Sequence, residues 1–109
     1  MTDDFYCDEV LSGRTAVNRL YETTNVLAFH HTRPFWPVHV VVIPKRHISS
    51  LLVLEKKDVP LLLELIQVVR EVARRLTARH GGCRILINVG SYQDSQHLHW
   101  HVSFGEPLA

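Results

Sequence analysis

The segment HLHWHVSF, at residues 97–104, has a histidine at every second position of its first five residues. Side chains alternate between the two faces of a β-strand. A strand here would therefore point His97, His99 and His101 to one face and the apolar side chains between them to the other. The segment predicts a strand that is buried on one face and carries a row of three imidazoles on the opposite face.

Upstream of this strand, residues 58–80 carry apolar residues at the spacing of one helix face. These apolar residues are Leu62, Leu65, Val69, Val72 and Leu76. Asp58 is a candidate N-cap, Pro60 suits the first turn, and the pair Gly81-Gly82 indicates the end of the helix. At about 1.5 Å per residue this helix is roughly 33 Å long, so it would cross one whole face of a small sheet.

Four further segments have the composition of strands. Residues 17–22 and 26–30 flank a short polar turn and indicate a hairpin, whereas residues 38–43 and 83–89 are β-branched, apolar runs. A short helix is also compatible with residues 7–12. The fold class predicted is α+β, with a five-stranded, mostly antiparallel sheet and one long helix packed on one face. The face that the helix leaves uncovered would be a functional site or an interface.

Composition limits the class of protein. Of the 109 residues, 46% are hydrophobic and 21% are charged, and the net charge is +1. These values predict one folded domain over residues 1–109 and give no basic field for nucleic acid. No apolar run reaches the roughly 18 residues of a membrane span. Cys7 and Cys83 form no CxxC pair or disulfide framework, so we predict a reduced, cytoplasmic protein that binds neither nucleic acid nor membrane.

Three imidazoles in strict alternation can attack an electrophile, shuttle protons or bind a metal. His99, His101 and Glu106 have the H-x-H-x4-E spacing of the ligands in a cupin-like metal site. Cupins are all-β barrels, whereas residues 58–80 predict a long helix. A metal-dependent enzyme that uses the His-x-His pair is therefore retained as the less favoured alternative.

Segments outside the histidine-rich strand extend the pattern. They are VLAFH at residues 26–30, PFWPVH at 34–39, VIPKRHI at 42–48 and NVG at 88–90. Together with HLHWHVS, these segments resemble the signature blocks of the histidine triad (HIT) superfamily, and in particular Hint-like nucleotide-binding proteins. The resemblance covers residues 8–104.

The resemblance implies a nucleotidyl hydrolase or transferase. Such an enzyme acts at the α-phosphate of a nucleoside phosphate derivative, for example a nucleoside phosphoramidate or a dinucleoside polyphosphate. His99 would be the nucleophile and would form a covalent nucleotidyl-histidine. His97 and His101 would flank it, to fix its tautomer and to donate hydrogen bonds to the non-bridging oxygens. His39 would help to hold the phosphate, and the reaction would need no metal.

The resemblance also assigns residues to substrate binding. Asn88 would orient a phosphate or the leaving group, Phe29 would line the base pocket, and Gln93 would lie near the phosphate. His31 stands where the family commonly has an acidic residue that binds the ribose hydroxyls, and an imidazole can accept one such bond but not both. Asp94 stands where a small hydroxyl residue is expected, and its charge would repel a phosphate unless the side chain turns away or is protonated.

Cofactor and partner expectations follow from the same resemblance. His47 is tied in some relatives to a structural zinc with two N-terminal cysteines. This chain lacks that cysteine pair, so we expect no zinc, no other cofactor and a structural role for His47. The resemblance implies a two-fold homodimer whose subunits share a sheet. Because His31 and Asp94 depart from the family pattern, a nucleotide-binding regulatory module with little catalysis remains an alternative.

Overall fold

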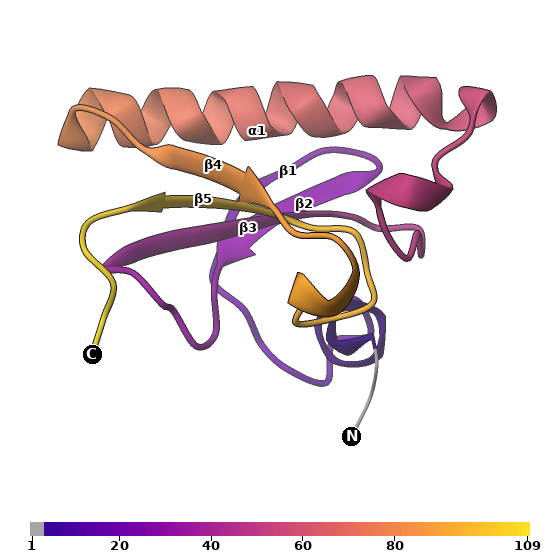
Figure 1. Cartoon of the computed structure of the whole chain (residues 1–109), viewed down its shortest axis with the longest axis horizontal. Coiled ribbons are helices and arrows are strands. Elements are labelled where there is room, and N and C mark those ends of the chain that lie inside the picture. The colour runs from indigo at the N-terminus through magenta and orange to yellow at the C-terminus, as the bar shows by residue number, and fades with distance from the viewer. Residues whose placement is uncertain (1–3) are drawn as a thin grey trace.

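The fold of the chain is an antiparallel sheet covered by one long helix. The computed structural model describes residues 4–109. Five strands are arranged in the order β1-β2-β3-β5-β4, and helix α1 (Val59–His80) lies across one face of the sheet (Figure 1). The strands are β1 (Arg19–Glu22), β2 (Val26–His30), β3 (Val38–Pro44), β4 (Arg84–Ile87) and β5 (Trp100–Phe104). The predicted fold class is confirmed.

The N-terminal segment lies on the face of the sheet away from α1. The predicted short helix is present as a π-helix, Tyr6–Leu11, and it lies below the sheet in the view of Figure 1. Shorter 3-10 turns occur at Leu51–Val53, Lys56–Asp58 and Gly90–Tyr92. The sheet therefore has α1 on one side and the N-terminal segment on the other.

Helix α1 follows the apolar spacing of its sequence. Its buried residues are Leu65, Val68, Val69, Val72 and Leu76. Gly81 ends the helix with φ 91°, and its N–H donates to the carbonyl of Thr77 at 2.8 Å. That left-handed conformation favours glycine, as predicted from the Gly81-Gly82 pair.

Asp58 precedes α1 but does not cap it. Its carboxylate accepts a hydrogen bond from the backbone N–H of Glu55 at 2.9 Å and pairs with Arg46 at 2.6 Å. The residue thus closes the preceding 3-10 turn, and its side chain makes no capping bond to α1. Asp58 therefore occupies the predicted N-cap position, but its carboxylate binds the N–H of Glu55 and Arg46 and makes no capping bond to α1.

The two faces of the sheet bury different sets of side chains. Trp100, Val102, Val40 and Val42 face α1 and form one apolar core with it. Tyr6 joins a second apolar cluster on the opposite face. The rest of that cluster is Val10, Leu27, Phe29, Val41 and Ile43. Burying each such side chain contributes about 1.5–3 kcal/mol, so both layers hold the sheet in place.

Strands β4 and β5 are shorter than predicted. The ladder between them ends where Ile87 pairs with Trp100, so His97–His99 precede β5 rather than belonging to it. The backbone there is held by the N–H of Leu98, which donates to the carbonyl of Ile48 at 2.6 Å. The alternation still continues through this stretch, because Leu98 lies in the core against α1.

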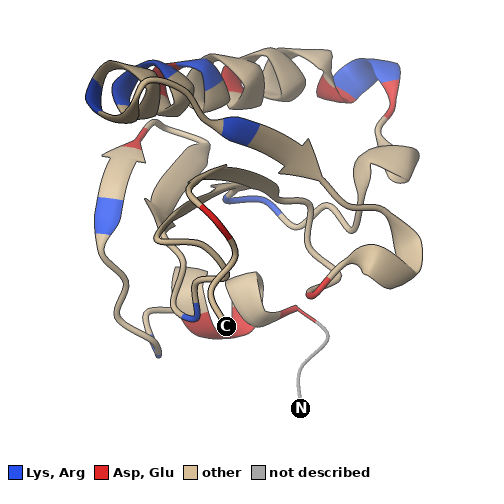
Figure 2. Cartoon of the chain, turned by 60° about the vertical axis from the view of Figure 1, so that its left-hand side comes forward, with Lys and Arg blue, Asp and Glu red and all other residues tan. Residues whose placement is uncertain are grey.

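Charged residues of both signs lie side by side along α1 (Figure 2). Glu71 pairs with Arg74 at 2.6 Å and with Arg75 at 2.7 Å. Within residues 4–109, no helix combines the length and the apolar character that crossing a bilayer requires.

Candidate active site

The three histidines of the predicted row lie on the face of the sheet opposite α1. His101 pairs with Val41 of β3, which pairs in turn with Phe29 of β2, so these residues share a face. The rings of His97 and His99 lie 5.8 Å and 5.0 Å from the ring of Tyr6. All three histidines are 2% exposed or less. His97 and His99 are therefore covered by Tyr6 of the N-terminal segment, whereas His101 packs among His31, His39 and His99, and none of the three lies under α1.

His99 is held in one tautomer by the backbone. Its Nδ1 lies 2.6 Å from the carbonyl oxygen of His97, and a carbonyl can only accept a hydrogen bond. Nδ1 therefore carries the hydrogen and Nε2 carries a lone pair. Burial lowers the pKa of His99 below its usual value, so the ring is neutral near pH 7. Within residues 4–109, this buried Nε2 has no hydrogen-bond partner.

His101 is held in the opposite tautomer by a chain that starts at another backbone group. The N–H of Phe35 donates to Nδ1 of His39 at 3.0 Å, so the hydrogen of His39 is on Nε2. That Nε2 lies 2.8 Å from Nδ1 of His101, which must accept, so His101 carries its hydrogen on Nε2. Burial lowers the pKa of His39 to about 4 and that of His101 to about 3, so both rings are neutral.

The free nitrogens of His99 and His101 are thus chemically different. The two rings lie 4.9 Å apart, and the Nε2 of His101 is also buried without a partner in the part of the chain that the structure describes. One nitrogen offers a lone pair and its neighbour offers an N–H. This arrangement can attack an electrophilic atom and donate a hydrogen bond to a negatively charged oxygen on it.

The ring of His97 is used elsewhere. Its Nε2 lies 2.8 Å from the carbonyl of Pro44, and its Nδ1 lies 3.0 Å from Asp4 and 3.3 Å from the sulfur of Cys7. The prediction that this imidazole donates to a phosphate is therefore not supported by the geometry. His97 fixes the tautomer of His99 through its backbone carbonyl rather than through its ring.

Two of the predicted binding residues lie on the same face as the histidines. Phe29 is buried, and its ring lies 5.9 Å from that of Tyr6. Asn88 is half-buried just after β4, two residues beyond Leu86, which pairs with His101. Alternation along β4 therefore puts Asn88 on the histidine face.

The other two predicted binding residues are engaged by the backbone. His31 stacks on His39 with ring centroids 4.3 Å apart, and its Nδ1 accepts the N–H of Arg33 at 2.9 Å. Its remaining nitrogen is a donor, which corrects the expectation that His31 accepts a bond from a ribose. Gln93 donates to the carbonyls of Ser49 and Ser95 and accepts the N–H of Gly90, so its side chain braces the loop.

Asp94 does not turn away from the histidines. A carboxylate oxygen of Asp94 and one ring nitrogen each from His99 and His101 all lie within 4.8 Å of one another. Glu106 belongs to no such donor group among residues 4–109, so the H-x-H-x4-E ligand set is not formed. The acidic residue beside the histidine pair is Asp94.

A second donor cluster joins the N-terminal segment to the body of the protein. Single donor atoms of Asp4, Cys7, His47 and His97 lie within 4.8 Å of one another. The Cys7 sulfur lies 3.3 Å and 3.9 Å from Nδ1 of His97 and His47, and both of these nitrogens contact the Asp4 carboxylate. One sulfur, two imidazole nitrogens and one carboxylate oxygen suit tetrahedral zinc.

The residues therefore fit a structural metal, which would fasten the N-terminal segment beside His97. The reason for expecting no zinc does not hold, because the Asp4 carboxylate supplies a fourth donor in a chain without a cysteine pair. The Asp4-x-x-Cys7 spacing is the sequence signal that could have pointed to this cluster.

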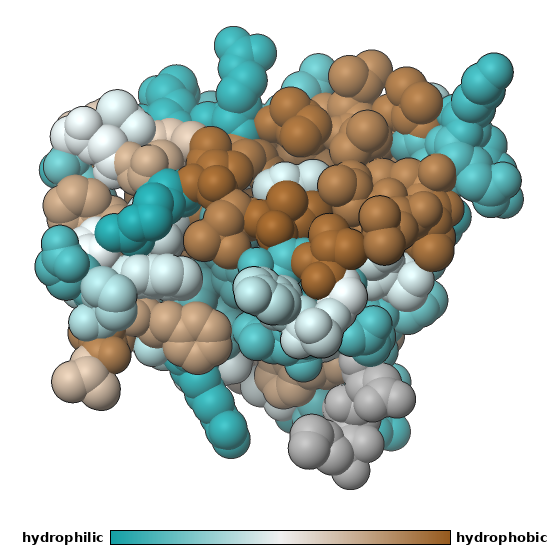
Figure 3. Space-filling model, viewed as in Figure 1, coloured by the Kyte–Doolittle hydropathy of each residue, from teal (hydrophilic) through white to brown (hydrophobic). Residues whose placement is uncertain are grey.

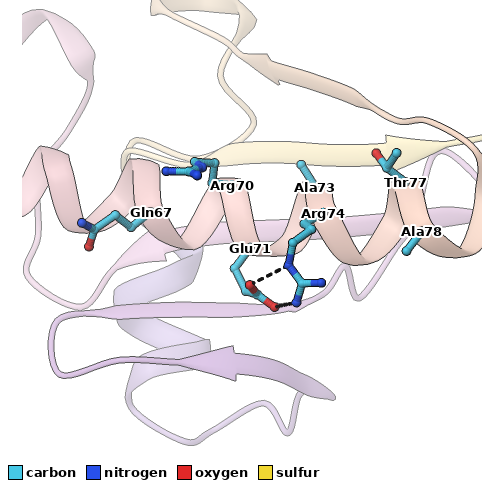
Figure 4. Close-up of a pocket in the computed structure, with 7 residues that line it drawn as sticks. All are labelled: Gln67, Arg70, Glu71, Ala73, Arg74, Thr77 and Ala78. Carbon is cyan, nitrogen blue, oxygen red and sulfur yellow. Dashed lines mark hydrogen bonds and ion pairs between the residues drawn. The ribbon is translucent and has the colours of Figure 1, made fainter.

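The surface hollows lie away from the histidines. The larger one, about 630 Å³, is a groove on the exposed side of α1 with the Glu71–Arg74 ion pair in it (Figure 4). The other, about 490 Å³, lies at residues 82–84 and 103–106. Neither of these two hollows contains a triad histidine. The Nε2 atoms of His99 and His101 are buried, so a ligand reaches them only if the side chains above them move.

Comparisons with known proteins agree with this fold. A protein-family model described as the HIT domain matches residues 13–106. An uncharacterized HIT-like protein of Azospirillum brasilense is 35% identical over 102 residues, which cover 91% of this chain and 84% of that protein. An uncharacterized HIT-like protein of Buchnera aphidicola is 27% identical over 110 residues, with 99% and 96% covered.

Two solved structures have the same fold over nearly the whole chain. A HIT family hydrolase from Legionella pneumophila superposes with a TM-score of 0.82 at 28% identity, covering 94% of this chain and 93% of the other. A histidine triad protein from Clostridium difficile superposes with a TM-score of 0.81 at 30% identity, covering 100% and 96%.

Proposed function

Because this chain belongs to the HIT domain family, we propose that it hydrolyses or transfers the nucleotidyl group of a nucleoside phosphate derivative. The reaction occurs at the α-phosphate through a covalent nucleotidyl intermediate on His99. The single observation that carries this proposal is the buried Nε2 of His99, a lone pair without a partner among residues 4–109. The name of the Legionella relative, a HIT family hydrolase, supports the same class of reaction.

The first step uses His99 as the nucleophile. The lone pair of Nε2 forms a bond to phosphorus, the bond to the leaving group breaks, and the leaving group departs with that electron pair. The Nδ1–H group keeps its hydrogen bond to the carbonyl oxygen of His97, which lies 2.6 Å from Nδ1. This bond stabilises the positive charge that the ring acquires. A neutral imidazole held in this way is a good nucleophile near pH 7.

His101 acts as the donor that stabilises the transition state. Its ring lies 4.9 Å from that of His99, and its Nε2–H donates to a non-bridging oxygen as negative charge develops there. His39 keeps the hydrogen on that nitrogen through its 2.8 Å bond to Nδ1 of His101. His39 is therefore a positioning residue in this mechanism.

The second step frees the enzyme. The oxygen of a water molecule, or of a second substrate, bonds to phosphorus, and the bond from phosphorus to His99 breaks. Its electron pair returns to Nε2, and the proton of the attacking molecule passes to solvent. Two displacements at a labile phosphoramidate replace one more difficult displacement.

The nucleoside would occupy the cluster that covers the histidines. Tyr6 and Phe29 are aromatic, buried and in edge contact, so they can hold a planar base when Tyr6 moves aside. Asn88 lies on the same face and supplies an amide that can bind a phosphate oxygen.

Hydrolysis of an adenosine phosphoramidate tests the proposal. We expect His99→Ala to lower the turnover rate on the order of a thousandfold or more, because it removes the nucleophile. His80→Ala is the matched control, since this histidine lies at the end of α1 and stacks on Phe104. Activity that survives in His99→Ala contradicts the assignment of the nucleophile.

One observation favours a second candidate, a nucleotide-binding module with little catalysis. Tyr6 covers His97 and His99, so the closed protein holds its triad away from solvent. Wild-type protein that binds a nucleotide but turns over no donor would favour this module over the enzyme. Turnover that requires an added metal would favour chemistry at His99, His101 and Asp94 instead.

We also propose a two-fold homodimer. Exposed apolar side chains gather over α1, β4 and the turn between β3 and α1 (Figure 3). They are Leu51, Leu52, Val53, Val59, Leu63, Ile66 and Ile85. Because β4 is an edge of the sheet, a second copy can pair with it about a two-fold axis and cover the apolar patch.

A further inference from the structure

Asp94 is an acidic residue that lies beside His99 and His101. Its carboxylate lies within 4.8 Å of a ring nitrogen of His99 and of His101, and its side chain is exposed on one side. We propose that Asp94 selects the leaving group: it favours a protonated amine attached to phosphorus and disfavours a leaving group that ends in phosphate. This inference rests on the proposed attack of His99 at an α-phosphate.

The surroundings of Asp94 leave its charge uncompensated. The imidazoles of His39 and His101 each accept a hydrogen bond at Nδ1, from the N–H of Phe35 and from Nε2–H of His39, so neither ring carries a positive charge. Within residues 4–109, no lysine or arginine forms an ion pair with Asp94. The carboxylates of Asp94 and Asp4 both act on His99, so the reacting position lies in a negative field. A leaving group with several phosphate charges is repelled there, and a cation is attracted.

The chemistry of a phosphorus–nitrogen bond suits this carboxylate. Such a bond breaks readily once its nitrogen is protonated, because the leaving group is then a neutral amine. A carboxylate that accepts a hydrogen bond from the protonated nitrogen favours that form. The proton comes from solvent when the nitrogen is protonated, before the attack.

The displacement step balances in charge and in bonds, and it needs no proton from His101. The lone pair of His99 Nε2 forms the new bond to phosphorus, and the old phosphorus–nitrogen bond breaks. Its electron pair stays on the leaving nitrogen, which departs as a neutral amine. The Nε2–H of His101 remains available to the non-bridging oxygen throughout.

The test compares two nucleotidyl donors in wild type and in two variants. Wild type, Asp94→Asn and the control Glu106→Gln are assayed with an adenosine 5′-N-alkylphosphoramidate and with diadenosine triphosphate. Glu106 is an exposed acid outside the donor group of His99 and His101. Asp94→Asn keeps the shape of the side chain and removes its charge, so folding is preserved.

We expect Asp94→Asn to lower kcat/KM for the phosphoramidate on the order of tenfold and to raise or preserve kcat/KM for the polyphosphate. The ratio of kcat/KM for the phosphoramidate to kcat/KM for the polyphosphate should be the same in wild type and in Glu106→Gln. A ratio that does not change in Asp94→Asn, or that changes equally in Glu106→Gln, overturns the inference.

A binding arm separates this inference from the proposed function. If wild type cleaves neither donor, the proposed function fails, but the charge of Asp94 is still measurable through the affinity for AMP. We expect AMP to bind Asp94→Asn on the order of tenfold more tightly than wild type at low salt, with a smaller difference at high salt. Equal affinity in the two proteins overturns the role assigned to Asp94.

Discussion

The free Nε2 atoms of His99 and His101 differ by one hydrogen, and two backbone groups set that difference. The carbonyl of His97 places a hydrogen on Nδ1 of His99, and the N–H of Phe35 acts through His39 to place one on Nε2 of His101. Backbone groups cannot exchange their roles as donor and acceptor. A nucleophile and a hydrogen-bond donor are therefore fixed side by side in the free protein.

Stability should depend on pH because these rings are buried in the neutral form. Burial lowers the pKa of His39 to about 4 and of His101 to about 3, whereas an unfolded histidine titrates near 6.5. Between about pH 6.5 and 4 the folded protein binds fewer protons than the unfolded chain. The stabilisation is complete above this window and decreases as the pH falls, by about 1.4 kcal/mol per pH unit for each histidine.

Denaturant unfolding between about pH 7.5 and about pH 5 measures this slope, since the carboxylates titrate mainly at lower pH. His101→Phe should make the dependence shallower by one ring. A free energy of unfolding that is constant over this range would show that the rings are not held neutral by burial.

Sequence alternation predicted which face each histidine occupies, but not what each ring contacts. His99 and His101 share the predicted face, as does His97. The ring of His97, however, contacts Asp4, which is 93 positions away in the chain, and no local pattern contains that contact. Contacts with a distant segment therefore engage the ring of His97. Among the described residues, one ring nitrogen, Nε2, remains without a partner in each of His99 and His101.

Among the elements, the N-terminal segment has two roles. It supplies two donors of the second donor cluster, and it carries the aromatic ring that covers His99. Asp4 and Cys7 lie on either side of Tyr6, whose ring packs on His99. We expect added zinc to raise the thermal midpoint of wild type, with a stabilisation of about 2.7 kcal/mol at a concentration of about 100 Kd. The donors are one thiolate, one carboxylate and two imidazoles.

Thermal unfolding with and without zinc, together with the absorption spectrum of bound cobalt, measures this effect. Cys7→Ser should abolish the shift and the sulfur-to-metal band. Cys83→Ser should keep both, because Cys83 lies near Thr77 and Ala73, outside the cluster. An equal shift in the two variants would place the metal elsewhere.

The end of α1 offers a matched pair of glycines. Gly81 has φ 91°, whereas Gly82 is not left-handed, and a Cβ on either residue meets no atom within 4 Å. We expect Gly81→Ala to destabilise the protein by about 1 kcal/mol, since only the backbone strain changes, and Gly82→Ala to be neutral or slightly stabilising. Equal free energies of unfolding for the two variants would contradict the role of Gly81 as the helix end.

The elements themselves were predictable where their signal is local. The periodicity of residues 58–80 predicted α1, and the composition of residues 26–30 and 38–43 predicted β2 and β3. The ends of β4 and β5 were not predictable, because a strand ends where its partner ends. The ladder ends at Ile87 and Trp100, although the predicted strand segments continue beyond these residues to Val89 and back to His97.

At the scale of the whole molecule, the apolar patch over α1 and β4 predicts the oligomeric state. Ile85 is 52% exposed on the edge strand, and Leu52, in the turn between β3 and α1, is 76% exposed. A stable interface buries on the order of 1,600 Å², so we expect the 12.6 kDa chain to sediment as a dimer at micromolar concentration.

A charge in the patch tests this assembly. Ile85→Lys should shift the protein to the monomer, because the lysine would be buried without a partner in the interface. Leu108→Lys, an exposed apolar residue near the C-terminus, should leave the dimer intact. A wild-type protein that sediments as a monomer would contradict the proposed dimer.

The intact mass of the protein after brief mixing with an adenylyl donor tests the central claim most directly. Denaturation at neutral pH preserves a phosphorus–imidazole bond for the measurement. We expect a mass increase of one adenylyl group in wild type, mapped to residue 99, and no increase in His99→Ala. An adduct on a different residue, or donor cleavage at the wild-type rate in His99→Ala, would contradict the central claim.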